Sequence, residues 1–198
     1  MKILNQLNKF GNLLKERIRE YIVISSESKQ LIIESKAVLL LCRQATSKVD
    51  QLISLEPDAK EGLLAVVQHK QIRIKAHFTP EKIIAKGNII EGRLKLLNKP
   101  NIETDSLIYR PLILIWKAVL GGNIDNQVLP ERMRIEGDVI YYEFPKDQLP
   151  LINALFCKIK DNSALNLSLI EGKLLIESDA SIDWSDFNIK ELVRLFTV

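Results

Sequence analysis

The chain is poor in the residue types that carry catalysis or hold a metal ion. It contains two cysteines and two histidines in 198 residues. Cys42 and Cys157 lie far apart, each without a neighbouring histidine that would lower the pKa of its thiol. His69 and His77 have no cysteine or carboxylate at the spacing of a metal site. We therefore expect buried thiols in a reducing compartment, no metal site and no enzymatic activity.

Glycine-rich loops and long apolar runs are also missing. The eight glycines are scattered and only Gly121 and Gly122 are adjacent, so the sequence predicts neither a phosphate-binding loop nor a bound cofactor. The longest apolar run covers only residues 37–42, whereas a membrane-spanning helix needs about 20 apolar residues. The N-terminal segment has no unbroken apolar stretch of the kind that a secretory signal requires. These absences predict a cytoplasmic protein, with peripheral membrane association as the alternative.

The excess of positive charge is small. The 28 basic and 25 acidic residues give a net charge of +3, which does not by itself indicate a nucleic-acid partner. Basic residues do fall on the polar faces of the expected strands, where they would form a stripe if those strands were neighbours: Arg73, Lys75, Arg93, Lys95, Arg132 and Arg134. Aromatic residues are not interleaved with them, as they are in proteins that bind single strands. We therefore do not expect nucleic acid as a partner, and a solvated sheet face is the simpler interpretation.

Apolar residues recur at helical spacing in residues 1–55. The first stripe runs through Ile3, Leu7, Phe10, Leu14, Ile18 and Tyr21, and the second, on a helix expected over 27–54, through Leu31, Val38, Cys42, Ala45, Val49 and Leu52. Two such helices joined by a short turn predict a helical hairpin arm over residues 1–55, followed by a second domain over 56–198. The first helix carries a surplus of basic residues. Residues 2–22 could therefore contact an anionic membrane surface, or pack on the protein itself or on a partner.

Beyond the arm, the apolar period changes from that of a helix to that of a strand. Apolar and polar residues alternate over 71–78, Gly87-Asn88 suits a two-residue hairpin turn, and 134–144 and 165–178 also have strand character. Thr79-Pro80 is expected to interrupt the first of these strands. Helices are expected over 106–120, over about 148–160 and from Ser185 onward. The predicted fold class is α+β, with a curved antiparallel sheet of hairpins packed on helices.

The tripeptide Ile-Glu-Gly occurs three times, in residues 89–97, 134–142 and 169–177. A turn at Glu171-Gly172 would place Leu169 opposite Leu174 and Leu167 opposite Ile176, which keeps one face apolar, so the third copy predicts a hairpin. The first two copies allow either a turn or an unbroken strand with Gly92 or Gly137 on the core face. The spacing between copies is unequal, which argues against a repeat fold.

The stretch from Lys99 onward resembles the LmeA-like phospholipid-binding family of bacterial proteins. The likeness lies in KPNIETDSLIYRPLILIWKAVLGG, RMRIEGDVIYYEFPKDQLPLINALF and LNLSLIEGKLLIES, with Asp147-Gln-Leu149 leading into a helix and Glu171-Gly172 closing a strand pair. The resemblance implies a curved sheet wrapped on a helix, an apolar groove for an acyl chain and no catalysis.

Two functions follow from these observations. The first is non-enzymatic binding of a lipid-like ligand or of a membrane surface by the α+β domain. The candidate ligand-binding residues are Leu112, Ile115, Trp116, Tyr141, Phe144, Leu155 and Phe156. The alternative is a structural or adaptor protein that uses its N-terminal helical hairpin to form a homo-oligomer or to hold a partner.

Overall fold

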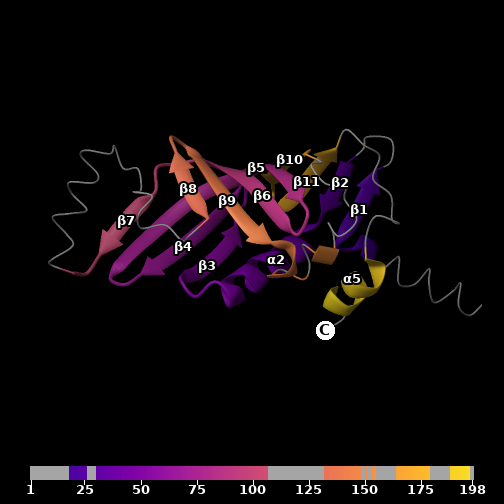
Figure 1. Ribbon diagram of the computed structural model, residues 1–198, viewed down its shortest axis with the longest axis horizontal. Helices are drawn as coiled ribbons and strands as arrows, with labels where there is room; N and C mark the ends of the chain where they lie inside the picture. Colours follow the sequence, from indigo (N-terminus) through magenta and orange to yellow (C-terminus); the bar gives the residue numbers. More distant parts are fainter. Residues whose placement is uncertain are drawn as a thin grey trace, which may run out of the picture.

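The computed structural model describes residues 18–25, 30–106, 132–148, 150, 153–154, 164–178 and 188–196. Within these ranges the fold is a single antiparallel sheet with two short helices (Figure 1). The strands are β1 (Ile22–Ser25), β2 (Gln30–Ile33), β3 (Leu52–Pro57), β4 (Leu63–His69), β5 (Ile72–Lys86), β6 (Ile89–Leu96), β7 (Asn101–Thr104), β8 (Met133–Glu136), β9 (Val139–Pro145), β10 (Ala164–Ile170) and β11 (Lys173–Ser178). The helices are α2 (Ser35–Lys48) and α5 (Ile189–Phe196), and a 3-10 turn, η2, covers Lys146–Gln148.

The long strand β5 organises the sheet. Its first half pairs with β4 and β7, and its second half pairs with β10 and β6. The register shifts by one residue between Pro80 and Lys82, where proline has no N–H to donate. The predicted interruption at Thr79-Pro80 is therefore wrong, because the chain passes through it as a bulge and continues as a strand. The sheet order through the second half is β1-β2-β11-β10-β5-β6-β9-β8.

The predicted α+β class with an N-terminal helical hairpin is wrong, and the described chain is mostly β. Residues 22–25 and 30–33 are strands, with Ile22 opposite Ile33. Their β-branched residues favour extended backbone, and burial of Leu31 and Ile33 follows a period of two rather than a helical stripe. The expected second helix shortens to α2, because Val49 is extended and Leu52 begins β3.

The N-terminal strands also belong to the main sheet, since β2 pairs with β11. The boundary predicted between residues 55 and 56 falls inside β3. The division into two domains stays a prediction. The helix expected over 106–120 lies outside the described residues apart from Ser106, as does most of the one expected over 148–160.

The three Ile-Glu-Gly copies take two different conformations. The third is the predicted hairpin, with Leu169 opposite Leu174 and Leu167 opposite Ile176, so that prediction is confirmed. The first is an unbroken strand within β6. The second is a turn, but at Gly137-Asp138, since Glu136 pairs with Val139. Gly137 has a φ of 64°, a left-handed value that glycine adopts without strain.

Two groups of apolar side chains form the core. The larger one joins α2, α5 and strands β1, β2, β5, β6, β10 and β11, and includes Ile22, Leu31, Ile33, Leu169, Ile176 and Leu192, none of which is more than 2% exposed. The smaller one lies around the first half of β5, and includes Ile74, Phe78, Leu96 and Ile102. Figure 1 shows α2 running below the central strands and α5 near β1. The larger core thus fixes α2 against one face of the sheet.

Candidate functional site

A groove of about 710 Å³ lies between α2 and the sheet face that it covers. Side chains from α2 and from eight strands line it, and nearly all of them are apolar. They are Val38, Leu41, Cys42, Ala45, Val49, Leu55, Leu63, Phe78, Pro80, Ile83, Ile90, Leu94, Arg132, Met133, Tyr142, Glu143, Phe144, Pro145, Leu167, Leu169 and Leu174. The two charged members, Arg132 and Glu143, come from the start of β8 and from β9.

The spacing of the residues on α2 explains why this space is open. Val38, Leu41, Cys42 and Ala45 recur at helical spacing, so they share one face of α2, and Val49 follows as its extended C-cap. The middle of that face is made of cysteine and alanine, whose small side chains leave room beside the strands that line the groove.

Gly92 and Tyr142 shape one wall of the groove. Gly92 on β6 pairs directly with Tyr142 on β9, and a Cβ at Gly92 would overlap the tyrosine ring. The ring lies over the glycine and stacks on Phe144, with 5.6 Å between centroids and 10° between planes. Burial raises the pKa of the Tyr142 phenol, which therefore stays neutral. Because Gly92 has no side chain, the Tyr142 ring can lie flat against the sheet at this wall of the groove.

Cys42 faces the groove as a protonated thiol. Its side chain is free of any disulfide and buried. Burial, with a smaller contribution from the Glu56 carboxylate, raises the pKa of the thiol to about 11. A thiol is nucleophilic only as the thiolate, so at neutral pH Cys42 acts as an apolar lining residue.

Metal-binding geometry is not found in the part of the chain that the structure describes, where no three His, Cys, Asp or Glu side chains come together. His77 has a local structural contact instead. Its Nε2 donates to the carbonyl oxygen of Glu61 at 2.7 Å, and its Nδ1 accepts from the Asn98 amide at 3.0 Å. These two contacts tie the imidazole to the loop before β4 and to the loop between β6 and β7.

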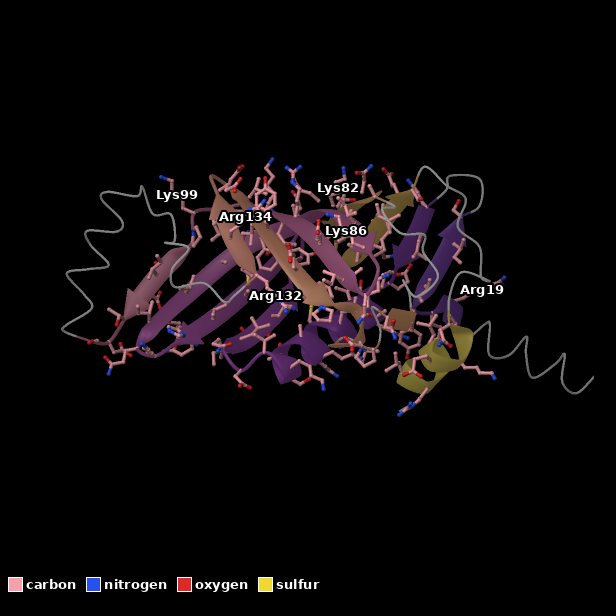
Figure 2. All side chains as sticks on the ribbon, viewed as in Figure 1. Arg19, Lys82, Lys86, Lys99, Arg132 and Arg134 are labelled. Atoms are coloured by element: carbon pink, nitrogen blue, oxygen red, sulfur yellow. The ribbon has the colours of Figure 1, made fainter. Side chains whose placement is uncertain are left out.

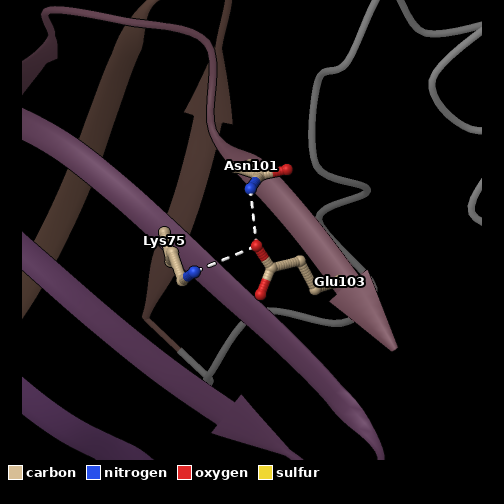
Figure 3. A network of polar contacts seen from close by, with 3 residues as sticks. All are labelled: Lys75, Asn101 and Glu103. Carbon is tan, nitrogen blue, oxygen red and sulfur yellow. Dashed lines mark hydrogen bonds and ion pairs between the residues drawn. The ribbon is translucent and has the colours of Figure 1, made fainter. Parts of the chain in front are cut away.

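The predicted stripe of six cations is divided by the register of β5. Arg73 and Lys75 lie on the half of β5 that pairs with β7, whereas Arg93 and Lys95 pair against the other half. Lys75 donates to Glu103 at 3.0 Å, and Asn101 donates to the same oxygen (Figure 3). The Lys75 ammonium lowers the pKa of Glu103.

Two of the four remaining cations of the stripe are paired as well. Arg93 lies 3.6 Å from Glu81, and Arg134 lies 3.0 Å from Glu136. Each of these two cations thus has an acidic side chain beside it, as is common on a solvated surface. A continuous positive surface therefore does not form across the described strands.

The predicted ligand-binding residues fall into three groups. Phe144 lines the groove. Tyr141 lies on the opposite face of β9, where its ring is 4.3 Å from the Arg134 guanidinium and 5.8 Å from that of Arg93. The other five lie outside the described residues: Leu112, Ile115, Trp116, Leu155 and Phe156.

Sequence reasoning missed the contribution of α2 and of the β10–β11 hairpin. The stripe through Val38, Cys42 and Ala45 was visible, but its small residues were assigned to a helix–helix contact. The apolar face of the hairpin was also visible as Leu167, Leu169 and Leu174. The sequence alone does not show that the apolar face of α2 and that of the hairpin lie on opposite sides of one groove.

Comparisons with known proteins find no match, whether with protein-family models, with curated proteins or with solved structures. The resemblance to the LmeA-like family therefore stays a prediction. No helix among the described residues is long and apolar enough to cross a bilayer.

Proposed function

We propose that the protein is a non-catalytic binder of an apolar, acyl-chain-like ligand, which occupies the groove beneath α2. The observation that carries this proposal is the volume of the groove, about 710 Å³, together with its apolar lining. Sites for small molecules in proteins are commonly concave, mostly apolar and about 300–1,000 Å³ in volume. The groove has these properties.

The volume also argues against a simple packing defect. Protein interiors are packed at a density of about 0.75 and have few voids larger than a water molecule. Emptying a site of a single leucine already costs about 3–5 kcal/mol, and that cost rises with the volume left behind. An acyl chain in contact with the walls of the groove would remove their apolar surface from water, which is worth about 25 cal/mol per Å².

Part of the N-terminal segment packs on the protein itself. Ile18 and Ile22 are almost completely buried in the larger core, and Glu20 pairs with Lys36 of α2 at 3.1 Å. A membrane contact through residues 2–22 stays a prediction, as does a homo-oligomer. The adaptor hypothesis required the helical hairpin, which the described residues do not form.

A fluorescent fatty acid such as cis-parinaric acid tests the proposal. The wild-type chain should bind the probe with saturation and enhance its fluorescence. Ala45→Phe, which fills the centre of the groove, should weaken binding by about tenfold or more, since each factor of ten corresponds to only about 1.4 kcal/mol of lost contact.

Leu39→Phe is the matched control. Leu39 lies on the same helix but is 41% exposed and does not line the groove. The control should bind the probe as the wild type does. Equal binding by Ala45→Phe and the wild type, or no saturable binding by either, would contradict the proposal.

A further inference from the structure

A second, smaller hollow joins the groove where β8 begins. It has a volume of about 210 Å³ and is lined by Glu91, Gly92, Arg132, Met133, Arg134, Tyr141, Tyr142 and Glu143. Four of these residues also line the groove: Arg132, Met133, Tyr142 and Glu143. The hollow and the groove therefore adjoin each other along these four residues. Unlike the groove, the hollow is surrounded mainly by charged and phenolic groups.

Arg132 is held at this junction by an unusual backbone conformation. Its φ is 73°, a left-handed value that is uncommon for a residue with a long side chain. The backbone N–H of Glu143 donates to the carbonyl oxygen of Arg132 at 3.0 Å, which continues the β8–β9 pairing by one residue. The left-handed conformation breaks the alternation of β8 at this point, so that Arg132 can line both spaces. Residues with strained backbone conformations cluster at active sites and ligand-binding sites.

The charges around the hollow are separated by strand. Carboxylates come from β6 and β9, where Glu91 and Glu143 are direct cross-strand partners. Guanidinium groups come from Arg132 and from Arg134 of β8, both marked in Figure 2. The two sides of the hollow thus carry opposite charge.

Two of these four charges are already neutralised. Glu91 lies 2.6 Å from Lys86, and Arg134 lies 3.0 Å from Glu136 and over the ring of Tyr141. Arg132 and Glu143, by contrast, have no ion-pair partner among the described residues, and they are not paired with each other. One cation and one anion therefore remain open to a ligand at the junction of the two spaces.

We propose that the ligand is an amphiphile with a zwitterionic head group, whose phosphate lies at Arg132 and whose ammonium lies at Glu143. This inference rests on the proposed function, because the acyl chain occupies the groove while the head fills the hollow. A purely anionic head would leave the Glu143 carboxylate unmatched, and a purely cationic head would leave the Arg132 guanidinium unmatched. Only a head group with both charges leaves neither Arg132 nor Glu143 unmatched.

Two monoacyl lipids with the same chain test this head-group assignment. One carries phosphoethanolamine and the other phosphoglycerol, and the binding of each to the full chain is measured by calorimetry below its micelle concentration. The phosphoethanolamine lipid should bind more tightly by roughly threefold to fivefold, which is the range of a partly exposed ion pair.

Single substitutions separate the two charges. Glu143→Gln should abolish the preference for phosphoethanolamine. It should weaken binding of the phosphoethanolamine lipid, and it should leave binding of the phosphoglycerol lipid unchanged or make it tighter. Arg132→Asn should weaken both lipids to a similar extent, and asparagine tolerates left-handed backbone, so that the variant retains the fold. Glu177→Gln on β11 and Lys95→Gln on β6 alter exposed charges that line neither space, and should change nothing.

The outcomes distinguish this inference from the proposed function. Equal binding of both lipids, unchanged by Glu143→Gln, would overturn the head-group assignment and leave the groove as an acyl-chain site. Tighter binding of the phosphoglycerol lipid to the wild type would also overturn it, in favour of an anionic head. Absence of binding of either lipid would overturn both proposals.

Discussion

At the scale of single residues, Gly92 is the position where the addition of one methyl group should have the largest effect on stability. The space above it is taken by the Tyr142 ring, which also forms a wall of the groove. We expect Gly92→Ala to lower the free energy of unfolding by about 1–3 kcal/mol, since a methyl group added to a filled space forces its neighbours to move. Urea denaturation measures this effect.

Gly87→Asn provides the comparison for that variant. Gly87 has a φ of 53°, and nothing lies within 4 Å of a Cβ placed there. Asparagine accepts that conformation, so this substitution should be nearly neutral. A Gly92→Ala variant as stable as Gly87→Asn would show that Tyr142 does not lie where we place it.

The thiol of Cys42 leads to a second prediction at this scale. Its pKa is raised to about 11 in the folded protein, from 9.0 for a free thiol, because burial disfavours the thiolate. Between pH 9 and 11 the Cys42 thiol is therefore protonated in the folded state but ionised in the unfolded state. The free energy of unfolding should consequently decrease as the pH rises through this range.

Cys42→Ala isolates this contribution from that of other groups that titrate at high pH. The variant should lose less stability between pH 9 and 11 than the wild type does, as measured by urea denaturation at each pH. Identical losses in the two proteins would indicate that the thiol is solvated rather than buried in the groove.

At the scale of elements, β2 is the part of the fold that departs most from the sequence-based expectation. Its Ile33 is completely buried, whereas Ile32, on the other face, is only partly buried. Ile33→Ala should lower stability by about 2–5 kcal/mol, and Ile32→Ala by clearly less. Equal costs at the two positions, measured by denaturation, would argue against a strand with one buried face.

The sequence predicted elements whose partners are close in the chain better than those whose partners are distant. The hairpin of β10 and β11 was predicted to the residue, because its turn and its apolar face both lie within one short segment. The strand at Ile72–Phe78 was also visible from its alternation. Local pattern was sufficient in both cases.

The N-terminal region shows why local pattern fails elsewhere. Residues 30–33 fit a helical stripe because a strand of four residues is too short to display its own period. They are strand because β11, far along the chain, offers them an edge to pair with. For the same reason the groove was invisible in the sequence, since its walls come from nine separate elements.

At the scale of the whole molecule, the fold is an antiparallel sheet with α2 on one face, and an apolar groove lies between the two. α2 packs on β3 and β11 and supplies small residues to the centre of the groove. The larger core, to which Cys42 of α2 and Leu169 of β10 both belong, holds the helix against the sheet. The architecture thus maintains an apolar groove, which we propose is occupied by a chain of methylene groups.

Native mass spectrometry of the full chain, purified without detergent, tests this central claim most directly. We predict a population heavier than the polypeptide by the mass of one lipid, which is released on denaturation and strongly reduced in Ala45→Phe but retained in Leu39→Phe. A wild-type spectrum with only the mass of the bare polypeptide, unchanged after incubation with monoacyl lipid, would contradict the account.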